Sequence, residues 1–201
     1  MIWIAHRINT VKELHSIHSK YGVEIDLRDR DNKIIMSHDP FIPGEDFEEY
    51  IKEYNHSLLI LNIKSEGIEF KVKKILEKFN VSNYFFLDSS FSMIFRLMEI
   101  NLSNIAVRAS EVESFQTIYN FNSQVDWVWV DCFKSLVLPI SDYKRMKSMG
   151  YKICLTSPDL LGRDNEIVEM ADYIKKHEIQ FDAICCKIHN IHHWKKCLDL
   201  N

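Results

Sequence analysis

The sequence lacks a strong excess of charge of either sign. Its 201 residues carry 25 lysines and arginines against 29 aspartates and glutamates, which gives a formal net charge of −4. Binding to the phosphates of nucleic acid is driven mainly by positive charge, so this balance disfavours nucleic acid as the main partner. A net charge of −4 does not exclude a local concentration of positive charge at a pocket.

Long apolar runs and internal divisions are also missing. No apolar stretch approaches the length that a bilayer-spanning helix needs, and the chain reaches His6 and Arg7 too soon for a secretory signal peptide. We find no repeat, low-complexity run or linker. We therefore expect a single domain over residues 1–201, without membrane insertion or secretion.

The cysteines do not form a pattern typical of disulfides or metal sites. There are five, an odd number, and they lie within apolar, strand-like runs: Cys132, Cys154, Cys185, Cys186 and Cys197. This distribution predicts reduced cysteines in the core of a cytoplasmic protein.

What the sequence does contain is a regular alternation of strand-like and helix-like segments. Strands are predicted at residues 2–5, 23–27, 58–64, 83–87, 104–107, 126–130, 151–155 and 181–186, and helices at residues 10–21, 46–54, 67–79, 90–100, 111–121, 140–149 and 165–177. Strands that alternate with helices predict a parallel sheet with covered faces. Eight of them predict an α/β protein of the closed (β/α)8 TIM-barrel type.

Groups capable of acid–base or metal chemistry follow the first apolar runs. His6 closes the first run, and His38 follows a short strand-like run twelve positions after Asp26. Glu24 and Asp26 are two residues apart in a strand, so their side chains share a face, where two carboxylates repel unless a cation lies between them. Two histidines and a metal ion are what in-line displacement at phosphorus needs: a base, an acid and a charge clamp.

The order of these residues resembles that of the glycerophosphodiester phosphodiesterases and their relatives, the phosphatidylinositol-specific phospholipases C and the sphingomyelinases D. The resemblance is specific for residues 4–40 and looser to about residue 188. It implies the same barrel fold, and it implies a role for each matching residue: His6 and His38 as the acid–base pair, Glu24 and Asp26 as metal ligands, and Arg7 as a phosphate contact.

In such barrels the chemistry gathers at the carboxyl ends of the strands, so the polar residues just past the later apolar runs are further candidates. We assign phosphate binding to the cations among them, and a supporting role to the acids. The cations are Lys64, Arg108 and Lys187, and the acids are Asp88 and Asp131. Two alternatives remain open: Asp88 is equally suited to capping the next helix, and Asp131 to orienting Arg108 or Lys187.

Two positions depart from the pattern of that family. Asn62 stands where the family usually has Glu; we assign it as a third metal ligand, since an amide oxygen can bind Mg²⁺ or Ca²⁺, although it supplies no charge. Lys187 stands where the family usually has Asp, and the added cation favours a substrate with more negative charge than a simple diester. Recognition of glycerol is therefore not assumed.

The resulting prediction is metal-dependent hydrolysis of a small, soluble phosphodiester by two-histidine acid–base catalysis. Mg²⁺ is favoured, with Ca²⁺ and Mn²⁺ as alternatives. Two other functions fit the same residues: hydrolysis of a phosphomonoester or a nucleotide-sugar pyrophosphate, and binding of a phosphorylated sugar or nucleotide by a catalytically reduced barrel. The attacking group is water or a hydroxyl of the substrate, and either His6 or His38 is the base. The sequence does not predict an oligomeric state.

Overall fold

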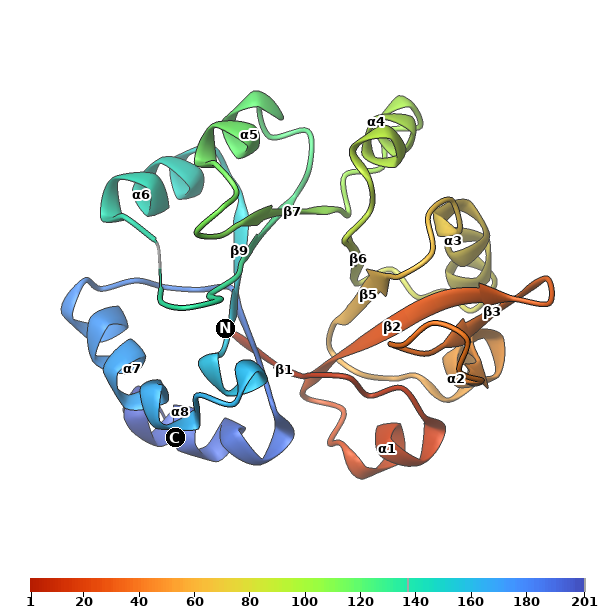
Figure 1. Ribbon diagram of the computed structural model, residues 1–201, viewed down its shortest axis with the longest axis horizontal. Helices are drawn as coiled ribbons and strands as arrows, with labels where there is room; N and C mark the ends of the chain where they lie inside the picture. The colour runs from red at the N-terminus through yellow and green to blue at the C-terminus, as the bar shows by residue number, and fades with distance from the viewer. Residues whose placement is uncertain (137, 201) are drawn as a thin grey trace. The chain divides into compact units, whose positions relative to one another are not determined.

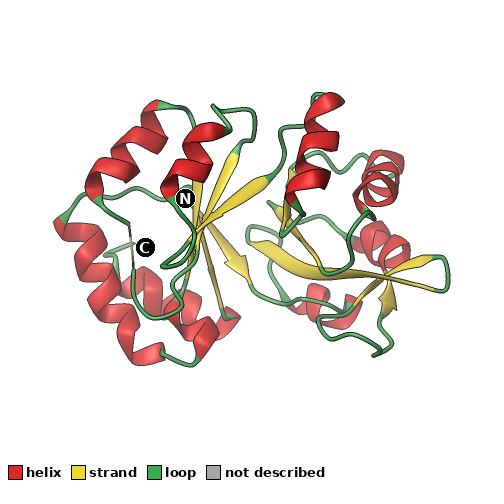
Figure 2. Ribbon diagram, turned by 45° about the horizontal axis from the view of Figure 1, so that its top comes forward, coloured by secondary structure: helices red, strands yellow, loops and turns green. Residues whose placement is uncertain are grey.

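The computed structural model describes residues 1–136 and 138–200, and the chain divides into two compact units (Figure 1). One unit consists of Arg7–Ile105, and the other of Met1–His6 together with Ala106–Asn201. Both units contain strands and helices (Figure 2), and these alternate along the chain except over residues 22–46, where three strands follow one another. The prediction of a single domain stays a prediction. No helix among the described residues is both long and apolar enough to cross a bilayer.

The unit formed by Arg7–Ile105 is built on three parallel strands, β2 (Gly22–Arg30), β5 (Leu59–Ile63) and β6 (Tyr84–Leu87). The other edge of β2 pairs antiparallel with β3 (Lys33–Met36), which pairs in turn with the short β4 (Glu45–Asp46). The helices are α1 (Val11–Ser16), α2 (Phe47–Glu53), α3 (Glu69–Lys78) and α4 (Phe91–Glu99). Every residue of β5 and β6 is buried, as their continuous apolar runs predict for parallel strands.

The other unit holds five parallel strands in the order β1 (Ile2–Ala5), β10 (Ala183–Cys186), β9 (Lys152–Thr156), β8 (Trp127–Val130) and β7 (Ala106–Ala109). Its helices are α5 (Phe115–Asn120), α6 (Ile140–Ser148), α7 (Ile167–Lys176) and α8 (Ile191–Cys197), with short 3₁₀ turns η1 (Pro158–Leu161), η2 (Asp164–Glu166) and η3 (Ile188–Asn190). Four of the five cysteines are buried, as predicted, and Cys197 is partly exposed.

All eight predicted strands are present, whereas two predicted helices were too long. The helix expected over residues 10–21 ends at Ser16, because the backbone of Ile17 is extended. The helix expected over residues 111–121 begins only at Phe115, capped by Ser114, because the side chain of Glu111 is engaged by a distant loop. The two-residue strand β4 was missed because it is too short to show a periodic pattern.

Candidate active site

Glu24 and Asp26 lie on β2 and are almost completely buried, with 1% and 0% of their surface exposed. The Oε2 atom of Glu24 accepts a hydrogen bond from the backbone N–H of Arg7, and its Oε1 atom accepts one from the amide of Asn62, both at 2.8 Å. Burial, together with the charge of Asp26, raises the pKa of Glu24 to about 7, although these hydrogen bonds act in the opposite direction. Glu24 therefore titrates near neutral pH.

Asp26 is fixed by a reciprocal pair of hydrogen bonds with Asn9. The amide of Asn9 donates to Oδ2 of Asp26 at 2.9 Å, and the backbone N–H of Asp26 donates to Oδ1 of Asn9 at 2.8 Å. The second carboxylate oxygen of Asp26, Oδ1, is buried and receives no hydrogen bond from the described residues. Lys64 Nζ lies 3.8 Å from it.

Asn62 on β5 pairs in register with Asp26, and its Oδ1 atom is also buried without a hydrogen-bond donor among the described residues. These two buried oxygens, one on the Asp26 carboxylate and one on the Asn62 amide, form with the carboxylate of Glu24 an oxygen-rich donor set of the kind that Mg²⁺ and Ca²⁺ prefer. Within residues 1–136 and 138–200, no three His, Cys, Asp or Glu side chains form a metal-binding group. The residues present therefore fit a hard divalent ion only if the amide oxygen of Asn62 serves as a ligand.

His38 is held between Arg7 and Asp39. The guanidinium of Arg7 lies 2.6 Å from Nε2 of His38, and Nδ1 of His38 lies 2.8 Å from Oδ1 of Asp39. Because a guanidinium can only donate, Nε2 must accept, and the ring carries its proton on Nδ1, which donates to Asp39. This hydrogen bond lowers the pKa of Asp39. The arrangement fixes the tautomer of His38, with the Nε2 lone pair engaged by Arg7.

A second arginine supports the loop that carries His38. Nε and Nη2 of Arg28 donate to the carbonyl oxygen of His38 at 3.2 and 2.8 Å, and Nη1 donates to the carbonyl oxygen of Lys64 at 3.0 Å. Sequence reasoning missed Arg28, Asn9 and Asp39. A signal for Arg28 was present, since it continues the every-second-residue series of Glu24 and Asp26 along β2.

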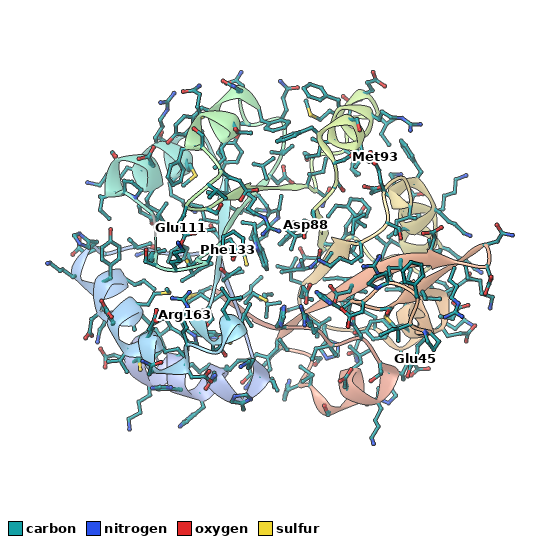
Figure 3. The ribbon with its side chains drawn as sticks, in the orientation of Figure 1. Glu45, Asp88, Met93, Glu111, Phe133 and Arg163 are labelled. Atoms are coloured by element: carbon teal, nitrogen blue, oxygen red, sulfur yellow. The ribbon has the colours of Figure 1, made fainter. Side chains whose placement is uncertain are left out.

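Lys64 lies between two carboxylates, since its Nζ atom is 3.8 Å from Oδ1 of Asp26 and 3.4 Å from Oδ2 of Asp88. Asp88, labelled in Figure 3, does not cap α4, because Ser90 occupies that position and accepts from the N–H of Met93. Asp88 and Arg7 both have a positive φ, at 63° and 56°. This conformation is uncommon for residues other than glycine and is found more often at functional sites.

The remaining predicted residues belong to the other unit. Arg108, on β7, forms an ion pair of 2.5 Å with Asp131, whose other oxygen accepts from the hydroxyl of Thr156. Asp131 thus contacts and orients Arg108, which is one of the alternatives that the sequence leaves open for this residue. Lys187 follows β10 and lies 3.8 Å from Asp164. His6 follows β1, and its backbone N–H donates to the carbonyl of Cys186 at 3.0 Å.

The structure therefore joins seven of the predicted residues into one network within Arg7–Ile105: Arg7, Glu24, Asp26, His38, Asn62, Lys64 and Asp88. The convergence of this network with His6, Arg108, Asp131 and Lys187 stays a prediction.

Among solved structures, the chain is similar to that of a glycerophosphodiester phosphodiesterase from Agrobacterium tumefaciens, with a TM-score of 0.67. The match covers 92% of this chain and 96% of that chain, at 11% sequence identity. No protein-family model and no curated protein sequence matches the chain. The similarity confirms the predicted α/β fold of the (β/α)8 barrel class, and at this identity it concerns the fold alone.

Proposed function

We propose that the protein hydrolyses a phosphodiester at the network of Arg7, Glu24, Asp26, His38 and Lys64. The observation that carries this proposal is the contact of Arg7 with His38, whose other ring nitrogen donates to Asp39. The buried carboxylates of Glu24 and Asp26 lie in the same network. Arg7 and Lys64 supply positive charge for a phosphate, and His38 supplies a proton-transfer atom oriented by an acid. The fold, shared with a glycerophosphodiester phosphodiesterase, is compatible with this chemistry.

In this proposal, Arg7 exchanges its hydrogen bond with His38 for one to the substrate phosphate. The exchange frees Nε2 of His38 to take up a proton from solvent, while Nδ1 donates to Asp39, which stabilises the doubly protonated ring from which Nε2 can then donate. Following the family resemblance, we assign proton donation to the leaving oxygen to His38 and proton removal from the attacking oxygen to His6. The reverse assignment is the alternative.

A divalent ion, with Mg²⁺ favoured, would be held by the carboxylates of Glu24 and Asp26 and the amide oxygen of Asn62. When bound, it would polarise a phosphoryl oxygen. The support for this site is the pair of buried oxygens without donors, on Asp26 and Asn62. Because Asn62 adds no charge, we expect weaker binding than three carboxylates would give.

The test is a release assay on phosphodiesters, phosphomonoesters and nucleotide-sugars, with Mg²⁺, Mn²⁺ or Ca²⁺ and with chelator. We expect release from diesters by the wild type, loss of activity in His38→Ala, and full activity in the control His18→Ala, which alters an exposed histidine of the same unit. Turnover of monoesters or pyrophosphates alone would favour those substrates instead. Binding of phosphate compounds without any turnover would favour the catalytically reduced binding module, which the substitution at Asn62 motivates.

The proposed substrate is a small molecule, and the expected compartment is the cytoplasm. The odd number of cysteines, and their position within apolar runs of the sequence, favour a reducing compartment.

A further inference from the structure

The connection between β3 and β4, residues 37–44, carries an uncharged apolar tip, Pro40-Phe41-Ile42-Pro43. Phe41 is 99% exposed, and Ile42 is 51% exposed. Phe41 also has a φ of +64°, a conformation that is costly for a bulky residue. Since the ring of Phe41 is fully exposed and its backbone is strained, its placement does not stabilise the fold and requires another explanation.

Both ends of this connection are anchored. Arg28 binds the carbonyl of His38, and the hydroxyl of Ser37 donates to the carbonyl of Asp39 at 3.0 Å. At the other end, Gly44 packs so tightly on β3 that a Cβ atom there would lie 2.0 Å from the carbonyl oxygen of Met36.

The following residue, Glu45, labelled in Figure 3, accepts a hydrogen bond from the N–H of Val11 through its carboxylate, at 2.8 Å. The tip is therefore held on a fixed base next to His38.

The tip lies close to the proposed phosphate site along the chain. Phe41 is three residues from His38, so their Cα atoms are at most about 11 Å apart. Arg7 contacts His38 directly. The apolar tip thus begins two residues after the histidine that Arg7 contacts, on the loop that borders the proposed phosphate site.

We propose that Phe41, with Ile42, is a specificity-determining contact for an alkyl group on the substrate, which is therefore an amphiphilic phosphodiester. This proposal rests on the proposed function, since it takes the phosphate to lie at Arg7 and His38. The occupant is the alkyl chain of the substrate itself, because an apolar surface next to a cationic site matches a phosphate that carries such a chain. A bilayer surface fits less well, since the apolar tip is only four residues long and the net charge of the chain is −4.

The first arm of the test measures kcat/KM for a series of alkyl p-nitrophenyl phosphates, from methyl to octyl, below the concentrations at which they form micelles. Phe41→Asn keeps a residue that tolerates the left-handed backbone and removes the ring. Each methylene that the ring covers is worth up to about fourfold in affinity. We expect kcat/KM to rise with chain length in the wild type, and Phe41→Asn to lose at least about tenfold on the octyl ester and little on the methyl ester. Phe95→Asn, a change at another exposed phenylalanine of the same unit, should behave as wild type.

The second arm measures binding without turnover. All four native tryptophans are buried, so a tryptophan introduced by Phe41→Trp reports on the tip separately. Methyl(octyl)phosphinate, which has two P–C bonds and no ester to cleave, should shift the emission of this tryptophan to shorter wavelength, and dimethylphosphinate should not. A shift with the octyl compound but no hydrolysis of any diester would support the tip contact and refute the proposed function. Hydrolysis that does not depend on alkyl chain length, together with an unchanged tryptophan emission, would refute the tip contact alone. The tip contact would also be refuted if the emission shifted only when vesicles were added, or only when the protein concentration was raised, because the tip would then bind a membrane or a second copy of the chain.

Discussion

Replacing Glu24 by Gln changes the charge of a buried carboxyl group without changing its volume. Burial and Asp26 raise the pKa of Glu24 from 4.5 to about 7. Because the folded-state pKa lies above the unfolded-state value, the stabilisation from protonated Glu24 is complete below pH 4.5 and is lost as the pH rises through about 7. This rise in the pKa of Glu24 corresponds to about 3 kcal/mol of stability lost between these limits.

The contacts of Glu24 indicate that Gln can be accommodated. The amide oxygen of the introduced residue can accept the N–H of Arg7, and its amide can donate to Oδ1 of Asn62, an acceptor without a donor in the wild-type structure, once the Asn62 amide rotates. We therefore expect Glu24→Gln to raise the free energy of unfolding by about 2–3 kcal/mol at about pH 9 in chelator, and to leave it nearly unchanged at about pH 4. Mg²⁺ should then stabilise the wild type and not the variant.

Urea unfolding followed by tryptophan fluorescence measures these differences, with Glu99→Gln as a control at an exposed glutamate of the same unit. The reasoning would be refuted if the wild type and Glu24→Gln, both in chelator, had the same free energy of unfolding at about pH 9. A Glu24→Gln protein that is equally destabilised at both pH values would also refute it, because the cost of Glu24 would then not depend on its charge.

Three further outcomes are expected. In calorimetry, Asp26→Asn should abolish Mg²⁺ binding while the exposed-site control Asp29→Asn retains it; equal heats would remove Asp26 from the ligand set. Asp39→Asn should lower kcat by about tenfold to a hundredfold, since Asp39 fixes the tautomer of His38, and unchanged kcat would exclude that role. Partial burial opposes ionisation of Glu111, but three backbone N–H donors lower its pKa to about 2. The stabilisation from ionised Glu111 is therefore present above pH 4.5 and is lost as the pH falls towards 2. In urea unfolding at pH 7, Glu111→Gln should lower the free energy of unfolding by about 1 kcal/mol, and no loss would show that the three hydrogen bonds do not stabilise the loop.

The strands and the principal site residues could be predicted from the sequence because they depend on local patterns. The apolar runs of β5 and β6 mark buried parallel strands, and the two-residue spacing of Glu24 and Asp26 puts both carboxylates on one face. The position of His38 after an apolar run places it at the end of a strand. These features need no knowledge of the tertiary structure.

The hydrogen bonds that complete the site could not be predicted, because they depend on contacts between distant segments. Asn9 reaches Asp26 across 17 positions, and Arg28 reaches the carbonyl of Lys64 across 36. The late start of α5 has a similar cause. Glu111 accepts hydrogen bonds from a loop more than twenty positions away, and Glu111, Phe133 and Arg163 gather in one region of their unit (Figure 3).

The central claim, phosphodiester hydrolysis with proton transfer by His38, is tested most directly by comparing two leaving groups. General acid catalysis is typically worth about a hundredfold to ten-thousandfold. His38→Ala should therefore lose that factor in kcat/KM on a diester with an alkoxide leaving group, and much less on a p-nitrophenyl diester, whose leaving group departs without a proton. His6→Ala should impair both substrates, because the attacking oxygen is the same in each. Equal losses on both leaving groups in His38→Ala would contradict the assignment.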